Sequence, residues 1–267
     1  MAEARRLLIW LDPGHGTLKR DGARDTGAAD TSGLGTRLCE KDLVLAAALR
    51  ARDLLTAQGH EARLTHQRAD YSEVMGYSDR GALAAATAYD CYVSLHLDSA
   101  SNPAMRGTTV FVPKLPVHCP RSRALAAALA AALRGEFGTP VSYPAARPAG
   151  VMAHWHNLGT FVGGGNSYSP GALALPEPLF MSNREDMEII RRDDFADRYA
   201  QAVVRGILRY AQSAEPEPIE TPWQEELRAA AAWARSMGIS DATRLGSPLT
   251  RGEYLVMRYR ERRASQP

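Results

Sequence analysis

Two kinds of apolar segment alternate between residues 7 and 211, and this alternation constrains the fold more than any other feature of the sequence. Short continuous apolar runs, typical of buried strands, occur in LLIWLD at 7–12 and YDCYVSLHLD at 89–98. The segment KDLVLAAALRARDLLTAQGH at 41–60 instead repeats its apolar residues with a helical period and stops at Gly59, a residue typical of helix ends. Strands that alternate with helices predict an α/β fold, with a mostly parallel sheet flanked by helices on both faces.

The remainder of this region repeats the two patterns. Further strands are expected in HEARLTH at 60–66, GTTVFVPK at 107–114 and GALALPEPLFMSN at 171–183. Further helices are expected at 78–88, at 121–138, and from a capping box of Ser182 and Glu185 to about residue 210. Residues 138–171 break the pattern with Pro, Gly, Ser and Asn, which is typical of a functional loop or a partly disordered segment.

The composition of the chain changes after residue 211. QSAEPEPIETP at 212–222 is rich in Pro and Glu and predicts an extended linker. Beyond it lie two helical patterns, one closed by Gly238 and one opened by a capping box of Thr250 and Glu253. A helical hairpin of this size is too small for a stable core of its own, so it either docks on the main domain or works with a partner. Its excess of Arg favours an anionic surface or a solvated helix face.

Composition excludes several classes of protein. A formal net charge of +2 in 267 residues gives no argument for nucleic-acid binding. No apolar run reaches the ~18 residues of a membrane span, so membrane insertion is not expected. The apolar run after Arg6 is too short for a signal peptide, and Cys39, Cys91 and Cys119 lack the spacing of a metal site or a disulfide framework. We therefore expect a protein made in a reducing cytoplasm.

Three side chains that can bind a metal lie at or just beyond the ends of predicted elements. His15 follows the first strand, Glu40 precedes the first long helix, and His96 stands near the end of YVSLHLD. Ligand sites in open α/β sheets gather beyond the carboxyl ends of the strands. Two imidazoles and one carboxylate suit catalytic zinc, which keeps one further position for water. Glycines on both sides of His15 let the backbone turn sharply, so these residues predict a Zn²⁺ site.

Other histidines and one cysteine are rival ligands. His154 and His156 in HWHN are two residues apart and would share one face of an extended segment. Their segment is irregular, so a role beside Trp155 in lining an exposed groove is favoured over metal binding. Cys39, beside Glu40, is interpreted as a small buried side chain and not as a ligand. Three further histidines are interpreted as surface or turn residues: His60, His66 and His118.

Short motifs also occur in the order that identifies a family. They are LDPGHG, DTGA, CEKDLVLAAALRARDL, SDRGALAAA, YVSLHLDS, GTTVFV and EPLFMSN. In this order, residues 6–211 resemble the zinc-dependent N-acetylmuramoyl-L-alanine amidases of the amidase type 3 family. The resemblance implies a mixed sheet flanked by helices, one zinc ion bound by His15, Glu40 and His96, and a catalytic carboxylate at Glu177.

The activity follows from the same resemblance. It implies hydrolysis of the amide bond between the lactyl group of N-acetylmuramic acid and L-alanine, so peptidoglycan is the expected partner. Zinc lowers the pKa of a bound water to about 7, and Glu177 would carry its proton to the departing amine. Two alternatives stay open: a zinc peptidase that cuts within the peptide stem, and a non-catalytic wall-binding module. The missing export signal favours a phage or prophage endolysin that reaches the wall after release.

The chain departs from the family pattern near the predicted site. Prolines flank Glu177, Leu179 replaces a motif glycine, and Asp98 stands where the family commonly has Asn. Because proline lacks an N–H donor, strand pairing around Glu177 is expected to be unusual. Four residues are candidates for substrate contacts or for support behind the metal ligands: Arg80, Asp98, His154 and His156.

The C-terminal segment resembles, more faintly, the surface-layer-homology-like segments of wall lytic enzymes. The landmarks are Trp-Ala, Gly-Ile-Ser-Asp and Thr-Arg-x-Glu within WARSMGISDATRLGSPLTRGEYLVMRYRER. The sequence thus predicts a zinc amidase catalytic domain at 1–211, a linker at 212–222, and a helical segment at 223–267 for wall binding or homodimerisation. A helical clamp packed on the catalytic domain is the alternative.

Overall fold

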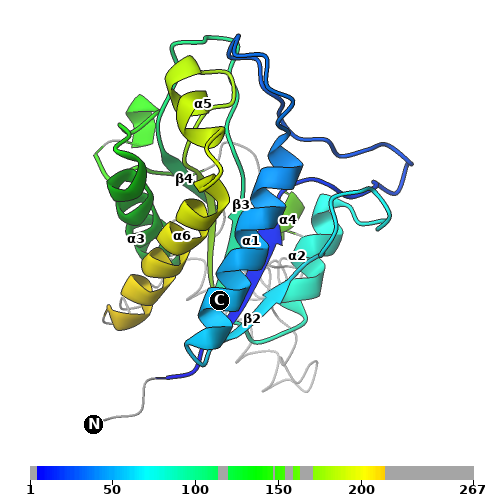
Figure 1. The fold of residues 1–267 in the computed structure, drawn as a ribbon. Helices are drawn as coiled ribbons and strands as arrows, with labels where there is room; N and C mark the ends of the chain where they lie inside the picture. The colour runs from blue at the N-terminus through cyan, green and yellow to red at the C-terminus, as the bar shows by residue number, and fades with distance from the viewer. Residues whose placement is uncertain (1–4, 114–119, 147, 154–158, 163–170, 214–267) are drawn as a thin grey trace, which may run out of the picture.

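The computed structural model describes residues 5–113, 120–146, 148–153, 159–162 and 171–213. Its strands are β1 (Leu8–Pro13), β2 (Glu61–Leu64), β3 (Cys91–Leu95), β4 (Thr109–Val112), β5 (Val151–Ala153) and β6 (Ala172–Glu177). Its helices are α1 (Glu40–Ala57), α2 (Tyr77–Ala85), α3 (Pro120–Phe137), α4 (Gly159–Val162), α5 (Arg184–Ile190) and α6 (Phe195–Gln212), with a 3-10 turn at Pro144–Ala146. Figure 1 shows these helices packed around a central sheet.

The strands form one six-stranded sheet in the order β2-β1-β3-β6-β4-β5. Neighbouring strands are parallel except for β4 and β6, which run antiparallel. The mixed, mostly parallel sheet expected from the sequence is therefore confirmed. Since β1 and β3 are neighbours, with Pro13 opposite Leu95, both strands end at the same edge of the sheet.

The two faces of the sheet bury different sets of side chains. Alternate residues of a strand point to opposite faces. Ile9 and Leu11 of β1 join a core formed with α1, α3 and α6, whereas Trp10 joins a smaller aromatic core with α2 and α4. Figure 1 shows α1, α3 and α6 over one face. The expected cover of helices on both faces is confirmed.

Strand β6 pairs in regular register with β4 up to Glu177, despite the prolines on either side of that residue. Pro176 lies opposite Val110 in the antiparallel pair with β4, but the amide of Val110 donates to the carbonyl of Gly150 (2.8 Å), so this pair needs no N–H from Pro176. Its carbonyl oxygen accepts from the amide of His96 (3.1 Å) and from the hydroxyl of Tyr199 (3.2 Å). These two bonds hold the end of β6 beside the end of β3, which carries His96.

The helix expected between residues 182 and 210 is two helices, and its predicted cap is wrong. Ser182 is buried and its hydroxyl accepts from the amide of Ala100 (2.9 Å), so it does not cap a helix. Asn183 caps α5 instead, because its side-chain oxygen accepts from the amides of Glu185 (3.0 Å) and Asp186 (3.1 Å). A turn at residues 191–194 separates α5 from α6.

The stretch at 138–171 is less irregular than expected, since its described part contains the 3-10 turn, β5 and α4. With three residues, β5 is too short to show an alternating pattern, yet it pairs in parallel with β4. Residues 214–267 lie outside the described residues, so the division into domain, linker and helical segment stays a prediction. In the described part of the chain, no helix is both long and apolar enough to span a membrane.

Candidate metal centre

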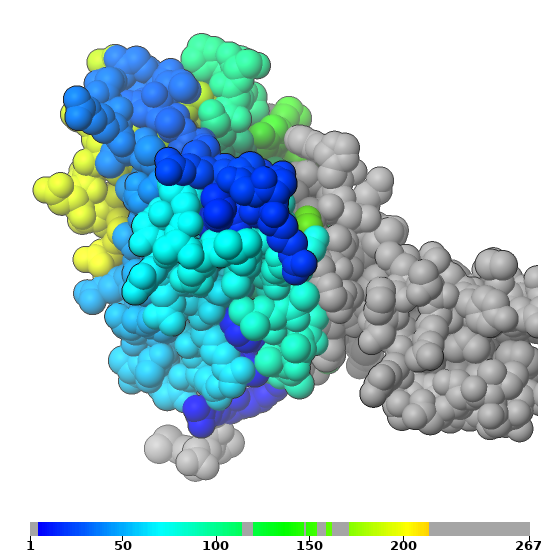
Figure 2. All heavy atoms as spheres, turned by 90° about the vertical axis from the view of Figure 1, so that its right-hand side faces the viewer, coloured from blue at the N-terminus to red at the C-terminus, as the bar shows by residue number. Residues whose placement is uncertain are grey.

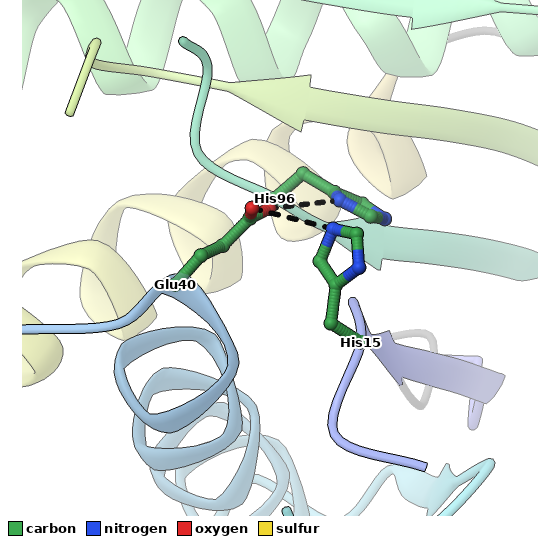
Figure 3. A group of neighbouring side chains, drawn as sticks. All are labelled: His15, Glu40 and His96. Carbon is green, nitrogen blue, oxygen red and sulfur yellow. Dashed lines mark hydrogen bonds and ion pairs between the residues drawn. The ribbon is translucent and has the colours of Figure 1, made fainter. Parts of the chain in front are cut away.

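Three side chains from separate elements meet at one edge of the sheet. His15 lies just past β1, Glu40 is the first residue of α1, and His96 lies just past β3. Oε2 of Glu40 lies 3.2 Å from Nε2 of His15, and Oε1 of Glu40 lies 3.0 Å from Nδ1 of His96. One ligand atom from each residue lies within 4.8 Å of the others. Figure 3 shows both imidazoles facing the carboxylate, so the structure brings the three predicted ligands together.

The carboxylate of Glu40 is held as an anion. Its side chain is 3% exposed, and its oxygens accept from the amides of Ala28 (2.8 Å) and Leu97 (2.9 Å). Burial opposes ionisation, but the hydrogen bonds with His15 and His96 outweigh it and keep the pKa of Glu40 well below its usual range. The residue therefore offers a charged oxygen to a cation.

A carboxylate lies beside each ring nitrogen of His15. Its Nδ1 lies 2.6 Å from Oδ1 of Asp25, and its Nε2 faces Glu40. Burial alone would lower the pKa of His15, but the hydrogen bonds to Asp25 and Glu40 outweigh burial and raise the pKa to about 9. Two carboxylates thus converge on a ring that holds a positive charge when no metal is bound. A divalent cation bound at this site would balance the negative charge of the same two carboxylates.

Two glycines make room for this cluster. A Cβ atom at Gly14 would lie 2.4 Å from Cε1 of His96, closer than any real contact. A Cβ atom at Gly27, whose φ is +68°, would lie 2.7 Å from Cδ2 of His15 and 2.8 Å from Oε2 of Glu40. Both rings and the carboxylate therefore occupy space that only glycine leaves free at these positions.

The donor set fits a zinc ion. Two imidazole nitrogens and one carboxylate oxygen are ligands of catalytic zinc sites, in which three protein ligands leave a position for water. Among the described residues, one group of three or more His, Cys, Asp or Glu side chains has its ligand atoms close enough together to bind a metal ion. That group is His15, Glu40 and His96. Of the rival ligands, His154, His156 and His118 lie outside the described residues.

Two side-chain predictions near the site are wrong. His66 is buried, at 2% exposure, and is not a surface or turn residue. It follows β2 at the same edge of the sheet, where burial and then the charge of Arg80 lower its pKa to about 4 and keep it neutral. Cys39, just before α1, is partly exposed instead of buried, and its thiol points to the carbonyl of Arg37 (3.8 Å). It is not part of the cluster.

Glu177 and Asp98 form a pair of carboxyl groups beside the cluster. Glu177 ends β6, Asp98 lies two residues beyond His96, and their side chains are hydrogen-bonded to each other. Burial, and then the charge of Asp98, raise the pKa of Glu177 well above its usual value. Burial also raises the pKa of Asp98, against the hydrogen bond that Tyr143 donates to it (2.9 Å). Two carboxyl groups in contact hold one proton between them.

Arg80 is buried and bonds to the backbone that carries His15. Its guanidinium is 1% exposed and donates to the carbonyls of Pro13 (2.9 Å) and His15 (3.0 Å) and to the hydroxyl of Thr17 (2.7 Å). It also lies 3.4 Å from Asp25. Of the two interpretations of Arg80, the geometry favours support behind the ligands.

Two residues near the cluster, Asp25 and Tyr77, have no role predicted from the sequence. Asp25 contacts His15, and the hydroxyl of Tyr77 donates to the same oxygen of Asp25 (3.0 Å). The signal that could have found Asp25 was its place in the DTGA motif.

Comparison with known proteins decides the family. The family model described as N-acetylmuramoyl-L-alanine amidase (Amidase_3) matches residues 9–209, which contain the three clustered residues and Glu177. The chain belongs to this family. The resemblance seen in the motifs is thereby confirmed, and so is the expected class of fold.

Individual relatives agree with this assignment. The chain is 36% identical to the N-acetylmuramoyl-L-alanine amidase AmiA of Salmonella typhimurium over 106 residues, which are 40% of this chain and 32% of AmiA. The match thus spans about a third of that relative's length. The germination-specific N-acetylmuramoyl-L-alanine amidase of Bacillus subtilis is 27% identical over 214 residues, covering 76% of this chain and 79% of the relative.

Solved structures share the fold. The amidase Ami1 of Mycobacterium smegmatis superposes with a TM-score of 0.66 at 22% identity, covering 80% of this chain and 100% of Ami1. AmiC2 of Nostoc punctiforme gives a TM-score of 0.59 at 25% identity, covering 79% of this chain and 100% of that chain. The α/β core described above is therefore the amidase fold.

Proposed function

We propose that this chain is a zinc-dependent N-acetylmuramoyl-L-alanine amidase, which hydrolyses the amide bond between N-acetylmuramic acid and L-alanine in peptidoglycan. One observation carries the proposal. His15, Glu40 and His96 place their ligand atoms within 4.8 Å of one another, in a chain whose residues 9–209 match the amidase family.

Each side chain has a defined part in this proposal. His15, Glu40 and His96 would hold the metal, with Nε2 of His15 turned toward Glu40 because Asp25 occupies Nδ1. A zinc ion bound there polarises the scissile carbonyl and lowers the pKa of a water molecule. Glu177 accepts a proton from the attacking water as the new C–O bond forms. When the C–N bond breaks, Glu177 returns that proton to the alanine nitrogen, and the remaining proton of the attacking water also ends on this nitrogen, so the products are an alanine ammonium group and a lactyl carboxylate.

The Asp98–Glu177 pair supports a carboxyl group that works in both directions. A residue that first accepts and then donates a proton works best with a pKa near the working pH. Burial and the contact with Asp98 raise the pKa of Glu177 toward that range, while positive charge at the metal centre favours its ionised form. The family commonly has Asn at the position of Asp98. In this chain, a pair of carboxyl groups, Asp98 and Glu177, therefore carries the proton.

Two other functions are compatible with parts of this geometry. A zinc peptidase acting within the peptide stem would use the same ligands and base, and only the products distinguish it. A non-catalytic wall-binding module needs neither the metal cluster nor Glu177, so the presence of all four residues argues against it.

Metal analysis tests the catalytic proposal against the binding module. The purified protein, freed of metal with a chelator and reloaded, is expected to take up one zinc ion per chain and to clear purified cell walls only when loaded. His96→Ala should lose both properties. Wall binding without bound zinc, and without clearing, would support the binding module instead.

The place of action and the partners are part of the proposal. The substrate lies in the cell wall, so a chain made in the cytoplasm has to reach it after release. The relatives named above are bacterial proteins, and origin in a phage stays a prediction from the sequence. The segment at 223–267 is proposed to bind the wall or a second copy of the chain, and lies outside the described residues.

A further inference from the structure

The backbone at His15 is in a conformation that side chains rarely adopt. Its φ is +67°, and His15 is one of two described non-glycine residues with a positive φ. Such a conformation persists only where surrounding contacts over-determine it, and it is most common at functional sites. Contacts behind His15 must therefore hold both its backbone and its ring.

Arg80 holds the backbone. From α2, its guanidinium donates to the carbonyls of Pro13 and His15, on either side of Gly14, and to the hydroxyl of Thr17. A guanidinium presents several donors in a rigid plane, so one side chain can fix three acceptors at once. The turn that carries His15 is thus tied to α2.

Asp25 holds the ring. It is 4% exposed, and its Oδ1 accepts from Nδ1 of His15 (2.6 Å) and from the hydroxyl of Tyr77 (3.0 Å), while Oδ2 lies 3.4 Å from Arg80. Tyr77 and Arg80 are three residues apart on α2 and therefore lie on one face of the helix. One face of α2 thus anchors the carboxylate that contacts the predicted ligand.

Backbone pairing fixes Asp25 in the same place. The amide of Gly16 donates to the carbonyl of Asp25 (2.8 Å), and the amide of Asp25 donates to the carbonyl of Thr17 (3.0 Å). The segment after His15 also pairs with the segment before α2, through bonds that join Leu18 to Glu73 and to Met75 (both 2.8 Å). Figure 2 shows these segments against each other, the first in blue and the second in cyan.

We propose that Asp25 is a positioning residue for His15, and that Tyr77 and Arg80 hold it in place. Because Nδ1 of His15 donates to Asp25, Nε2 is the atom left to face Glu40 and the metal. This inference rests on the proposed function of His15 as a metal ligand. Carboxylates that orient a ligating histidine typically contribute 10–100-fold to metal affinity when tested by mutation.

The test measures metal binding by the full chain with a competing chromophoric chelator. Asp25→Ala is expected to weaken zinc binding about 10–100-fold and to change the visible absorption spectrum of the cobalt-substituted protein. Asp25→Asn and Tyr77→Phe should weaken binding less, because each keeps part of the contact. Asp70→Asn is the matched control, since Asp70 is exposed in the neighbouring segment and contacts Ser72. It should bind zinc like the wild type.

Two other effects could change the measured zinc affinity or the behaviour of the Asp25 variants: proton competition at His15 and a purely structural role of Asp25. A metal ion displaces the proton on His15, so affinities are compared at about pH 7 and about pH 9, where proton competition differs. A merely structural role of Asp25 would lower the thermal midpoint of the metal-free protein and leave both the zinc Kd and the cobalt spectrum of the folded protein unchanged.

The outcomes are distinct. If the wild-type protein binds no zinc, the proposed function fails and this inference fails with it. If the wild type binds zinc, and Asp25→Ala binds equally tightly with the same cobalt spectrum, the inference alone is overturned. Should Asp25→Ala not fold, Asp25→Asn decides in its place: an unchanged Kd and spectrum overturn the inference, and a weaker Kd supports it.

Discussion

The carboxyl group of Glu177, at the end of β6, is hydrogen-bonded to that of Asp98, two residues beyond His96. The charge of Asp98 adds to burial in raising the pKa of Glu177. Asp98→Asn removes that charge and should lower the pKa of Glu177. A base works only when ionised, so the acidic limb of kcat/KM against pH is expected to move to lower pH. Asp53→Asn, at an exposed position of α1, is the control. An acidic limb that stays in place or moves to higher pH would contradict the pairing.

Removing the proton carrier should separate catalysis from metal binding. Glu177→Gln is expected to reduce kcat about 10²–10⁴-fold, the range of general acid–base catalysis, while zinc content stays at one ion per chain. Activity is measured as release of peptide from purified peptidoglycan, and zinc by elemental analysis. Glu188→Gln changes an exposed glutamate of α5 and should keep wild-type activity. A fully active Glu177→Gln enzyme would sink the assigned role.

Gly27 is predicted to be required for the metal centre and not only for its turn. Gly27 (φ +68°) and Gly22 (φ +83°) both have left-handed backbones, but a Cβ atom at Gly27 would lie 2.7 Å from His15 whereas one at Gly22 meets nothing within 4 Å. Both alanine variants should lose roughly 1–2 kcal/mol of stability from backbone strain. Only Gly27→Ala should also lose zinc affinity. Equal zinc affinity in the two variants would show that the cluster tolerates the added methyl group.

The pH dependence of stability is expected to differ between the metal-free and loaded proteins. The pKa of His15 is about 9 in the folded metal-free protein, above its ordinary value of 6.5. A raised folded pKa stabilises the protein below pH 6.5, and this stabilisation is lost as the pH rises through 9. The free energy of unfolding of the metal-free protein should therefore fall by up to about 3 kcal/mol over that interval.

Denaturant titrations at several pH values measure this slope. His15→Asn removes the titrating ring, so its metal-free form should show no such slope. Bound zinc occupies the place of the proton, so the loaded wild type should be nearly flat between pH 6.5 and 9. A metal-free wild type that is equally stable at both ends of the interval would contradict the coupling of His15 to its two carboxylates.

The sequence was most informative where one local rule places residues in space. His15 and His96 each follow an apolar strand, and the carboxyl ends of neighbouring parallel strands meet at one edge, so their proximity could be predicted. Asp25 could not be assigned in this way, because its role depends on Tyr77 and Arg80, which come from a helix more than fifty residues later.

Errors arose where a local pattern competed with contacts from elsewhere in the chain. Ser182 has the residue type of a helix cap, but its hydroxyl is taken by the amide of Ala100, and Asn183 caps α5 instead. His66 stands among polar residues and is predicted to be a surface or turn residue, yet it is buried, with Nδ1 3.2 Å from the hydroxyl of Thr65 and with a pKa lowered by the charge of Arg80. Neither the bond from Ala100 nor the burial of His66 near Arg80 can be read from the residues that flank these positions.

The central claim is tested most directly by the chemical identity of the cut bond. Purified peptidoglycan is digested with the zinc-loaded protein, with the chelated protein, and with the chelated protein after zinc is restored, and the products are identified by mass spectrometry. The account predicts new L-alanine amino termini and intact stem crosslinks, lost on chelation and regained with zinc. New amino termini within the peptide stem, or L-alanine release that chelation leaves unchanged, would contradict it.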